Sequence, residues 1–158
     1  MQLATRAEVH VPLPPERVFD VAVACETFPR ILRPLGPIPG IAQARMLDAP
    51  GPATGARRRI ELTDGSSLDE ELLAVERPSR HTYRWLGPPA RPLGLLVRRG
   101  TGDWSFVPEA GGTRVVWSYR FELSSPLAAP LAWPVVLLFR RWMAAGLEAL
   151  RAELASRP

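Results

Sequence analysis

Several residue types are rare or missing in this sequence, and each absence excludes a class of site. Cys25 is the only cysteine, which excludes an internal disulfide and any multi-cysteine metal site. His10 and His81 are the only histidines, too few for a histidine-based metal site. The sequence also has no phosphate-binding glycine motif and no nucleophile-base pattern around a serine. We therefore expect neither a metal nor a cofactor, and the sequence identifies no catalytic residue.

Lysine and asparagine are absent, and all 20 basic residues are arginine, which is typical of a GC-rich genome. The net charge is +4, but 16 acidic residues are interspersed with the arginines. The arginine clusters are short and lie in different segments, at 57–59, 98–99 and 140–141. No single basic stripe results, so we expect no nucleic-acid partner.

The sequence lacks a hydrophobic run long enough to span a membrane. The longest charge-free run, 123–139, is broken by three prolines and falls short of the roughly 20 apolar residues that a span requires. The first ten residues contain no signal-peptide core, so we expect a cytoplasmic protein. A membrane-surface role stays open as an alternative, because Arg140 and Arg141 follow an apolar segment with Trp133 and Trp142.

The length and composition predict one globular domain over 1–158. A chain of 158 residues is large enough to bury roughly two thirds of the surface that its unfolded form exposes. The 18 prolines divide the chain into short elements, and no linker-like segment separates them.

Alternating apolar and polar residues predict strands along most of the chain. The clearest is 113–123, where apolar and polar side chains take opposite faces. The other predicted strands are 3–10, 41–47, 56–63, 68–76, 81–86 and 104–107, with a hairpin turn at 64–67. A short helix is expected at 16–24, with a second helical turn at 26–33. Short connections favour an antiparallel sheet in an α+β fold.

The segment 126–155 predicts one long helix with an unusually wide apolar face. Its apolar residues fill an arc of roughly 200°, where a core-facing stripe needs about 100°. They are Val135, Val136, Leu138, Phe139, Trp142, Met143, Gly146, Leu147, Leu150 and Leu154. Such a helix is expected to cover a broad concave sheet and to enclose a cavity with it.

Three segments and the terminal helix that follows them form a recognisable order. The segments are VPLPPERVFDVAVACETFPRI, ELLAVERPSRHTYRW and GDWSFVPEAGGTRVVWSYRFEL. In this order they resemble the START-related, birch-pollen-allergen-like superfamily known as SRPBCC, and within it the polyketide cyclase/dehydrase group. The resemblance implies a helix-grip fold, in which a seven-stranded antiparallel sheet wraps around the long C-terminal helix and leaves a ligand cavity. It carries no universal catalytic motif. The proline-rich segment 87–99 departs from the pattern, and we expect a loop there before the sixth strand.

The alternation places a set of aromatic and apolar residues toward the expected cavity. We predict that the ligand-binding residues are Tyr83, Trp85, Trp104, Phe106, Trp117, Tyr119, Phe139, Trp142, Met143 and Gly146. The alternative is that these rings only fill a core. Gly146 lies within a helix, where glycine costs about 1 kcal/mol, so it leaves room for a ligand or for a closely packed neighbour.

Three residues are candidate polar groups of the pocket: Arg58, Glu71 and His81. His81 shares the phase of the inward aromatics, so it is either a pocket acid or base or a hydrogen-bonded structural histidine. The acidic run 69–71 covers both strand faces, so at least one carboxylate is expected to face inward. It would then form an ion pair with an arginine or transfer protons in an aldol-type cyclisation.

Three functions remain open from the sequence. The first is binding of a small hydrophobic, lipid-like or aromatic molecule. The second is an enzyme of the cyclase/dehydratase type that uses polar pocket residues. The third is an interaction module with a vestigial cavity, for which a homodimer is one form. Convergence of two or more polar side chains inside the pocket favours the enzyme over a carrier.

Overall fold

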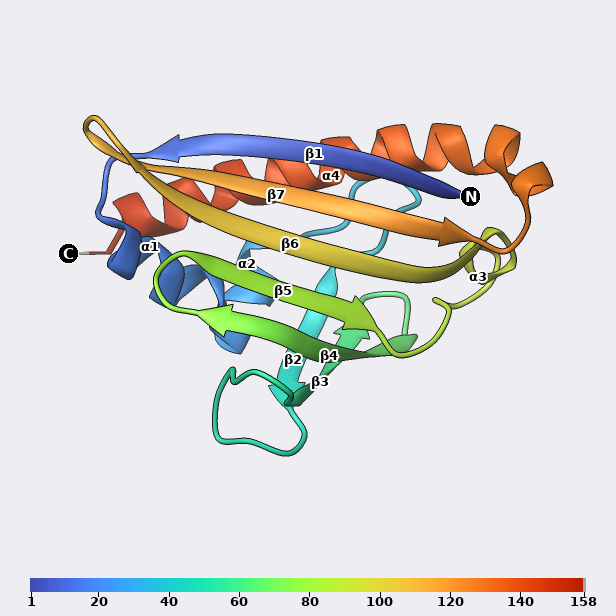
Figure 1. The fold of residues 1–158 in the computed structure, drawn as a ribbon, viewed down its shortest axis with the longest axis horizontal. Helices are drawn as coiled ribbons and strands as arrows, with labels where there is room; N and C mark the ends of the chain where they lie inside the picture. The colour runs from blue at the N-terminus through green and yellow to red at the C-terminus, as the bar shows by residue number, and fades with distance from the viewer. Residues whose placement is uncertain (158) are drawn as a thin grey trace.

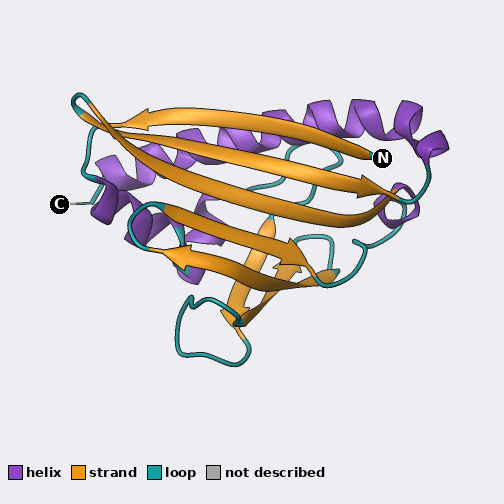
Figure 2. Cartoon of the chain, in the orientation of Figure 1, coloured by secondary structure: helices purple, strands orange, loops and turns teal. Residues whose placement is uncertain are grey.

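The computed structural model describes residues 1–157, which form a seven-stranded antiparallel sheet and a long C-terminal helix (Figure 1, Figure 2). The strand order is β1-β7-β6-β5-β4-β3-β2, so β1 and β2 are the edges. The strands are β1 (Gln2–Val11), β2 (Ile41–Met46), β3 (Arg57–Leu62), β4 (Ser67–Glu76), β5 (Arg80–Trp85), β6 (Val97–Glu109) and β7 (Gly112–Leu123). The predicted α+β helix-grip fold is confirmed.

The helices lie between the strands and at the end of the chain. They are α1 (Pro15–Ala22), η1 (Cys25–Thr27), α2 (Phe28–Ile31), α3 (Leu93–Leu96), η2 (Pro126–Ala128) and α4 (Ala129–Ala155). Proline stands in the first turn of α1, α2, η2 and α4, where its missing N–H costs no helical hydrogen bond. The prolines thus define where these helices begin.

The sixth strand is much longer than its predicted apolar run. It begins at Val97 rather than at Trp104, directly after the short helix α3. The sequence signal is weak because Gly100 and Gly102 stand where inward side chains would otherwise alternate. These glycines are required by the packing described below, and the loop expected over 87–99 is therefore partly helix and strand.

The sheet bends around α4. The long strands β1, β7 and β6 run beside the helix, whereas β2 and β3 cross their direction steeply (Figure 1). The helices α1 and α2 also pack against α4. The helix lies along the free edge of β1, where Arg140 Nε donates a hydrogen bond of 3.1 Å to the Arg6 carbonyl. This contact ties the helix to the sheet edge.

The core lies between the concave sheet face and the apolar face of α4. Strand β7 buries alternate residues along its whole length, as its sequence pattern predicts. The helix buries Ala132, Val136, Trp142, Met143, Gly146, Leu147, Leu150 and Leu154, while Val135, Leu138 and Phe139 are not fully covered. Within residues 1–157, no helix is long and apolar enough to cross a membrane.

Candidate functional site

An aromatic layer occupies the space between the sheet and α4. It is formed by Tyr83, Trp85, Trp104, Phe106, Trp117, Tyr119, Phe121, Phe139 and Trp142. All of these rings are buried except Phe139, which is half-buried. The Trp104 and Trp117 ring centroids are 4.5 Å apart, and Tyr119 meets Phe139 of the helix at 5.0 Å. The predicted pocket residues are thus brought together, and in this structure their rings pack on one another.

Hydrogen bonds fix the orientation of the rings in this layer. Trp85 Nε1 donates to the Tyr119 hydroxyl at 3.0 Å, and Trp117 Nε1 donates to the Tyr83 hydroxyl at 3.2 Å. Burial and the nearby Glu70 charge raise the pKa of Tyr83 to about 12. Burial likewise raises the pKa of Tyr119 well above its usual value. Both phenols therefore stay protonated and neutral at physiological pH.

Two glycines of β6 allow the rings of β5 to lie flat against the sheet. A Cβ atom on Gly100 would come within 2.8 Å of the Trp85 ring, and one on Gly102 would overlap the Tyr83 ring. The absence of these two side chains thus sets the positions of two aromatic residues. It also accounts for the missing alternation in the sequence of β6.

Gly146 of α4 is in contact with Leu32 rather than with open space. A Cβ atom at this position would lie 2.6 Å from Leu32 Cδ2. The Trp117 ring lies 3.7 Å from the same point. The glycine therefore admits the segment that follows α2, which is the packing role that the sequence left open.

A buried ionic cluster borders the aromatic layer on β3, β4 and β5. It consists of Arg58, Glu70 and His81, whose exposed fractions are 1%, 5% and 2%. Arg58 Nε and Nη2 donate to Glu70 Oε2 at 3.0 and 2.6 Å. Arg58 Nη1 lies 3.4 Å from His81 Nε2. The guanidinium also lies over the rings of Phe28 and Tyr83, with its carbon 4.7 and 5.2 Å from their centroids.

Burial sets the charges within the cluster. Burial and the Arg58 charge lower the pKa of His81 to about 3, so the imidazole is neutral at physiological pH. Burial raises the pKa of Glu70, and the Arg58 charge opposes this rise. Burial alone would lower the pKa of Arg58, but the Glu70 carboxylate reverses the direction and raises it. The guanidinium is thus a fixed cation beneath the aromatic rings.

His81 Nδ1 receives no hydrogen-bond partner from the described residues. When Arg58 donates to Nε2, the neutral ring carries its proton on Nδ1. The Ala74 backbone is close enough to favour the protonated ring and to raise the pKa of His81 slightly, but its distance and angle to Nδ1 do not make a hydrogen bond. The Thr27 hydroxyl, also buried, is likewise unpartnered within residues 1–157. A buried donor without an acceptor is costly, so this part of the cluster is suited to an oxygen atom that the protein does not supply.

Glu71, one of the three predicted polar groups of the pocket, does not face inward in the structure. It lies on the outer face of the sheet and pairs with Arg84 at 2.7 Å, whereas its neighbour Glu70 faces inward. The hairpin register explains this, because Arg57, Arg58 and Arg59 stand opposite Glu71, Glu70 and Asp69. Three arginines facing three acidic residues across a short turn were a readable signal. Arg58 shares the inward face of Ile60, so its partner Glu70 must face inward as well.

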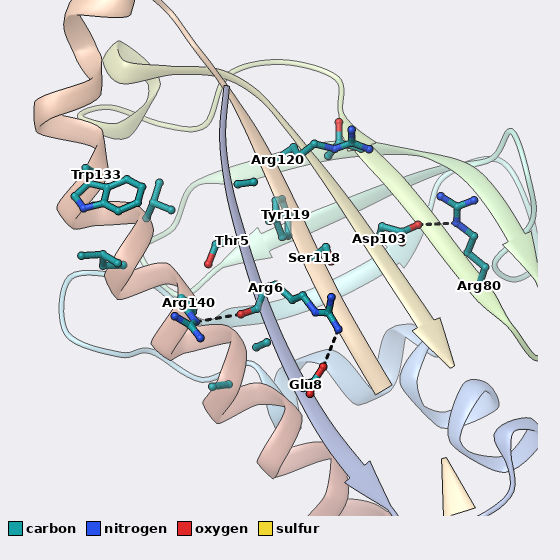
Figure 3. Close-up of a pocket in the computed structure, with 16 residues that line it drawn as sticks. Thr5, Arg6, Glu8, Arg80, Asp103, Ser118, Tyr119, Arg120, Trp133 and Arg140 are labelled. Carbon is teal, nitrogen blue, oxygen red and sulfur yellow. Dashed lines mark hydrogen bonds and ion pairs between the residues drawn. The ribbon is translucent and has the colours of Figure 1, made fainter. Parts of the chain in front are cut away.

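A large hollow lies outside the aromatic layer, along β1. It has a volume of about 1130 Å³, with the first half of α4 on one side and the outer face of β6 and β7 on the other. Figure 3 shows the ion pairs Arg6–Glu8 and Arg80–Asp103 at its surface. Its buried lining residues are Ala7, Tyr119 and Val136. Tyr119 is thus the ring that connects this open hollow with the aromatic layer.

The described part of the chain contains no cluster of three or more His, Cys, Asp and Glu side chains that could hold a metal ion. Cys25 is half-buried beside the ionic cluster, and burial raises the pKa of its thiol. The thiol is therefore mainly protonated and a poor nucleophile at neutral pH. The chemistry available here is hydrogen bonding and electrostatic stabilisation by Arg58, His81 and the tyrosine hydroxyls.

A protein-family model matches the sequence of this chain, and solved structures resemble its fold. The family model described as polyketide cyclase / dehydrase and lipid transport matches residues 2–155. No curated protein matches the sequence. Many solved structures share the fold.

Three of the solved structures illustrate this likeness. The structure of Ara h 8.0201 matches with a TM-score of 0.77 at 15% identity, covering 99% of this chain and 100% of that one. Norcoclaurine synthase from Thalictrum flavum matches with a TM-score of 0.73 at 13% identity, covering 99% and 88%. TTHA0849 from Thermus thermophilus matches with a TM-score of 0.68 at 25% identity, covering 98% and 100%. At these identities the likenesses describe a common fold over the whole chain.

Proposed function

Because the chain belongs to the polyketide cyclase / dehydrase and lipid transport family, we propose that it binds a small hydrophobic ligand between the sheet and α4. The ligand is aromatic or lipid-like and carries an oxygen atom that accepts hydrogen bonds from the Arg58 cluster. The observation that carries this proposal is the buried cluster of Arg58, Glu70 and His81 beneath an aromatic layer.

A purely structural core has no need of this cluster. Replacing a buried ion pair with apolar side chains of similar volume is often neutral or stabilising. Here the pair is accompanied by a His81 Nδ1 donor that no described residue satisfies, which adds a further cost. A ligand oxygen that accepts a hydrogen bond from Nδ1 would remove that cost. Its apolar body would lie against the neighbouring rings of Tyr83 and Phe28, both within reach of the guanidinium.

The ligand reaches this layer through the hollow along β1. Its buried lining residues Tyr119 and Val136 belong to the sheet and to α4, so the passage lies between the two layers. Because the rings pack on one another in this structure, entry requires rings to move. Phe139 is the half-buried ring of the layer and contacts both Tyr119 and Phe121, so its displacement opens the layer.

A second candidate function is a cyclase/dehydratase-type enzyme, and the convergence of polar groups favours it. A fixed guanidinium stabilises the negative charge that develops on a carbonyl oxygen when a proton leaves the adjacent carbon. Because the pKa of His81 is lowered to about 3 and that of Tyr83 is raised to about 12, these groups are a weak base and a weak acid at neutral pH, and they stabilise the developing charge by donating hydrogen bonds. In an aldol-type cyclisation, the carbanion attacks a second carbonyl carbon of the same chain, and the proton removed from carbon is returned to the oxygen of that carbonyl, which becomes a hydroxyl. Loss of this hydroxyl together with a proton from the adjacent carbon releases water and leaves a carbon–carbon double bond.

A ligand panel tests the proposed function. We expect aromatic ketones, phenols and carboxylates to raise the melting temperature, and hydrocarbons of the same shape to raise it less. The double variant Arg58→Met/Glu70→Leu removes the polar anchor without leaving an unpaired charge, so it should abolish this difference. The matched control Arg59→Met/Asp69→Leu replaces the neighbouring outer pair and should retain it.

Native mass spectrometry of the protein purified from its host complements the panel. A bound small molecule is expected. Apo mass alone, together with no thermal shift from any member of the panel, would contradict the binding function. Conversion of an added polyketone chain to a cyclised product, lost in His81→Gln, would support the enzyme over the carrier.

A further inference from the structure

Exposed large hydrophobic side chains gather at one end of the molecule. Seven of the eight in the described chain lie where β1 begins, where β5 ends, on α3, or on η2 and the first turns of α4 (Figure 1). They are Met1, Leu86, Leu95, Leu127, Leu131, Trp133 and Leu137. We call this set the apolar end. The eighth, Leu73, lies on β4.

Backbone hydrogen bonds hold the parts of the apolar end together. The amide of Leu123 donates to the Met1 carbonyl at 3.0 Å, which joins the end of β7 to the start of β1. The amide of Ser124 donates to the Leu96 carbonyl at 2.9 Å, which joins α3 to the segment before η2. The exposed leucines are therefore carried by one connected surface.

Leu127 and Leu131 of the apolar end project from the surface and line neither hollow, whereas Trp133 and Leu137 border the hollow along β1. Leu127 is 88% exposed, Leu131 is 67% exposed and Trp133 is 51% exposed. A folded partner would need hollows to receive such projecting side chains, whereas the deformable interfacial region of a bilayer accepts them directly. A half-exposed tryptophan is the residue that proteins favour at a membrane–water interface.

The charged residues at this end are mainly basic. Arg91, Arg98 and Arg99 are exposed on the segments that flank α3, and Arg140 and Arg141 follow Leu137 on α4. The acidic residue beside Arg98 and Arg99 is Glu122, at 3.8 and 4.0 Å, which is longer than a direct hydrogen bond. The arginine side chains therefore have donors available for another anion.

A hollow of about 530 Å³ brings these features together. Its lining consists of Leu86, Gly87, Pro88, Gly94, Arg98, Arg99 and Glu122. It is separate from the hollow along β1, because the two have different lining residues. Two guanidinium groups beside the exposed Leu86 form a site that can bind the phosphate of a lipid headgroup.

We propose that the apolar end docks on the surface of an anionic lipid bilayer. Leu127, Leu131 and Trp133 enter the interfacial region, and Arg98 and Arg99 bind lipid phosphate in the smaller hollow. Trp133 and Leu137 also border the hollow along β1, but no residue of the apolar end belongs to the ionic cluster or to the aromatic layer, so the proposal does not depend on the ligand proposed above.

Vesicle co-sedimentation tests the proposal. The protein is expected to bind vesicles made of equal parts phosphatidylglycerol and phosphatidylcholine at low salt, and to bind pure phosphatidylcholine vesicles at least about tenfold more weakly. Arg98→Gln/Arg99→Gln should weaken binding to the anionic vesicles by about thirtyfold, since each arginine near the surface contributes about fivefold. The matched control Arg45→Gln/Arg57→Gln removes the same charge from β2 and β3 and should bind nearly as well as the wild type.

The apolar contribution is tested in the same assay with Leu127→Ser/Leu131→Ser. Both side chains are exposed, so the variant should keep the stability of the wild type while its vesicle binding is lost. Leu73→Ser, an exposed leucine on β4, is the matched control and should bind normally.

Three results would overturn the proposal. The first is no binding of the wild type to anionic vesicles at low salt. The second is equal loss of binding in the test and control variants. The third is a dimer in light-scattering measurements that Leu127→Ser/Leu131→Ser dissociates, since a second copy of the chain would then cover the apolar end.

Discussion

Arg58 and Arg59 are adjacent residues with opposite surroundings. Substituting each in turn compares the contribution of a buried ion pair to stability with that of an exposed one. Arg58 is buried against Glu70, whereas Arg59 pairs with Asp69 near the surface. Removing one partner of a buried pair leaves an uncompensated charge, so Arg58→Met should lower the free energy of unfolding by about 3–5 kcal/mol. Arg59→Met should change it little. Urea unfolding monitored by circular dichroism measures both.

The double variant Arg58→Met/Glu70→Leu is the control for this interpretation. It removes both charges, so most of the lost stability should return. A double variant as unstable as Arg58→Met would show that the loss comes from packing rather than from an unpaired carboxylate.

His81 should make the stability depend on pH. Its pKa is about 3 in the folded protein against 6.5 when exposed. The unfolded chain therefore binds a proton below pH 6.5 that the folded chain does not bind, and the folded state loses about 1.4 kcal/mol per pH unit down to about pH 3. Above pH 6.5 the imidazole is neutral in both states, and the cost vanishes.

The variant His81→Gln isolates this contribution, because glutamine keeps a hydrogen-bonding side chain but does not titrate. Its stability relative to the wild type should improve by about 2 kcal/mol between pH 7 and pH 5. The raised pKa of Glu70 acts on stability in the opposite direction, but it is present in both proteins and cancels in the comparison. Urea unfolding at each pH gives the difference, and a constant difference would contradict a neutral buried His81. His10→Gln, at the exposed histidine, is the control.

At the scale of the element, the glycines of β6 position the aromatic residues of β5. Gly102→Ala would force its new methyl group into the Tyr83 ring, so we expect a loss of about 1–3 kcal/mol and a shifted tryptophan fluorescence spectrum. The spectrum should change because Trp117 donates its hydrogen bond to the same tyrosine. Urea unfolding and emission spectra measure the two effects.

Gly51→Ala is the control for this substitution. No described atom lies within 4 Å of the position that its Cβ would occupy, so the new methyl group meets open space. We expect unchanged stability or a gain of about 0.5 kcal/mol. Equal effects of the two substitutions would mean that the Tyr83 ring does not depend on the space at Gly102.

The elements were largely predictable from sequence, because proline and alternation mark their limits. The pattern of β7 predicts its inward face residue by residue, and all five apolar residues of that face are buried. The alternating pattern is lost on β6, because two glycines stand at inward positions. On β4 it does not decide between the consecutive residues Glu70 and Glu71, since either carboxylate could be assigned to the inward face. A register shift between Leu72 and Ala74 further interrupts the alternation of β4. Which carboxylate faces inward is therefore decided by the pairing of β4 with β3 and not by the pattern of β4 alone.

For the whole molecule, the curved sheet brings together groups that are distant in the sequence. Phe28 on α2 is distant in the sequence from Arg58 on β3, yet its ring lies against the guanidinium of Arg58. Trp142 of α4 donates a hydrogen bond to the Arg33 carbonyl at 2.9 Å and also meets the Trp117 ring. The sequence indicates which side chains face inward, but the filling of the interior depends on how these distant segments pack. Whether the space between the sheet and α4 is open or filled could therefore be learned only from the structure.

The position of α4 along β1 has a further consequence. An edge strand presents unpaired backbone groups that invite pairing with another chain, and here the helix and the Arg140 side chain cover that edge. Moving the helix away from β1 widens the passage to Tyr119, but it also uncovers the edge. On the proposed entry route, ligand exchange and self-association would begin from the same opened state, and a bound molecule that holds the helix in place would also protect the protein against aggregation.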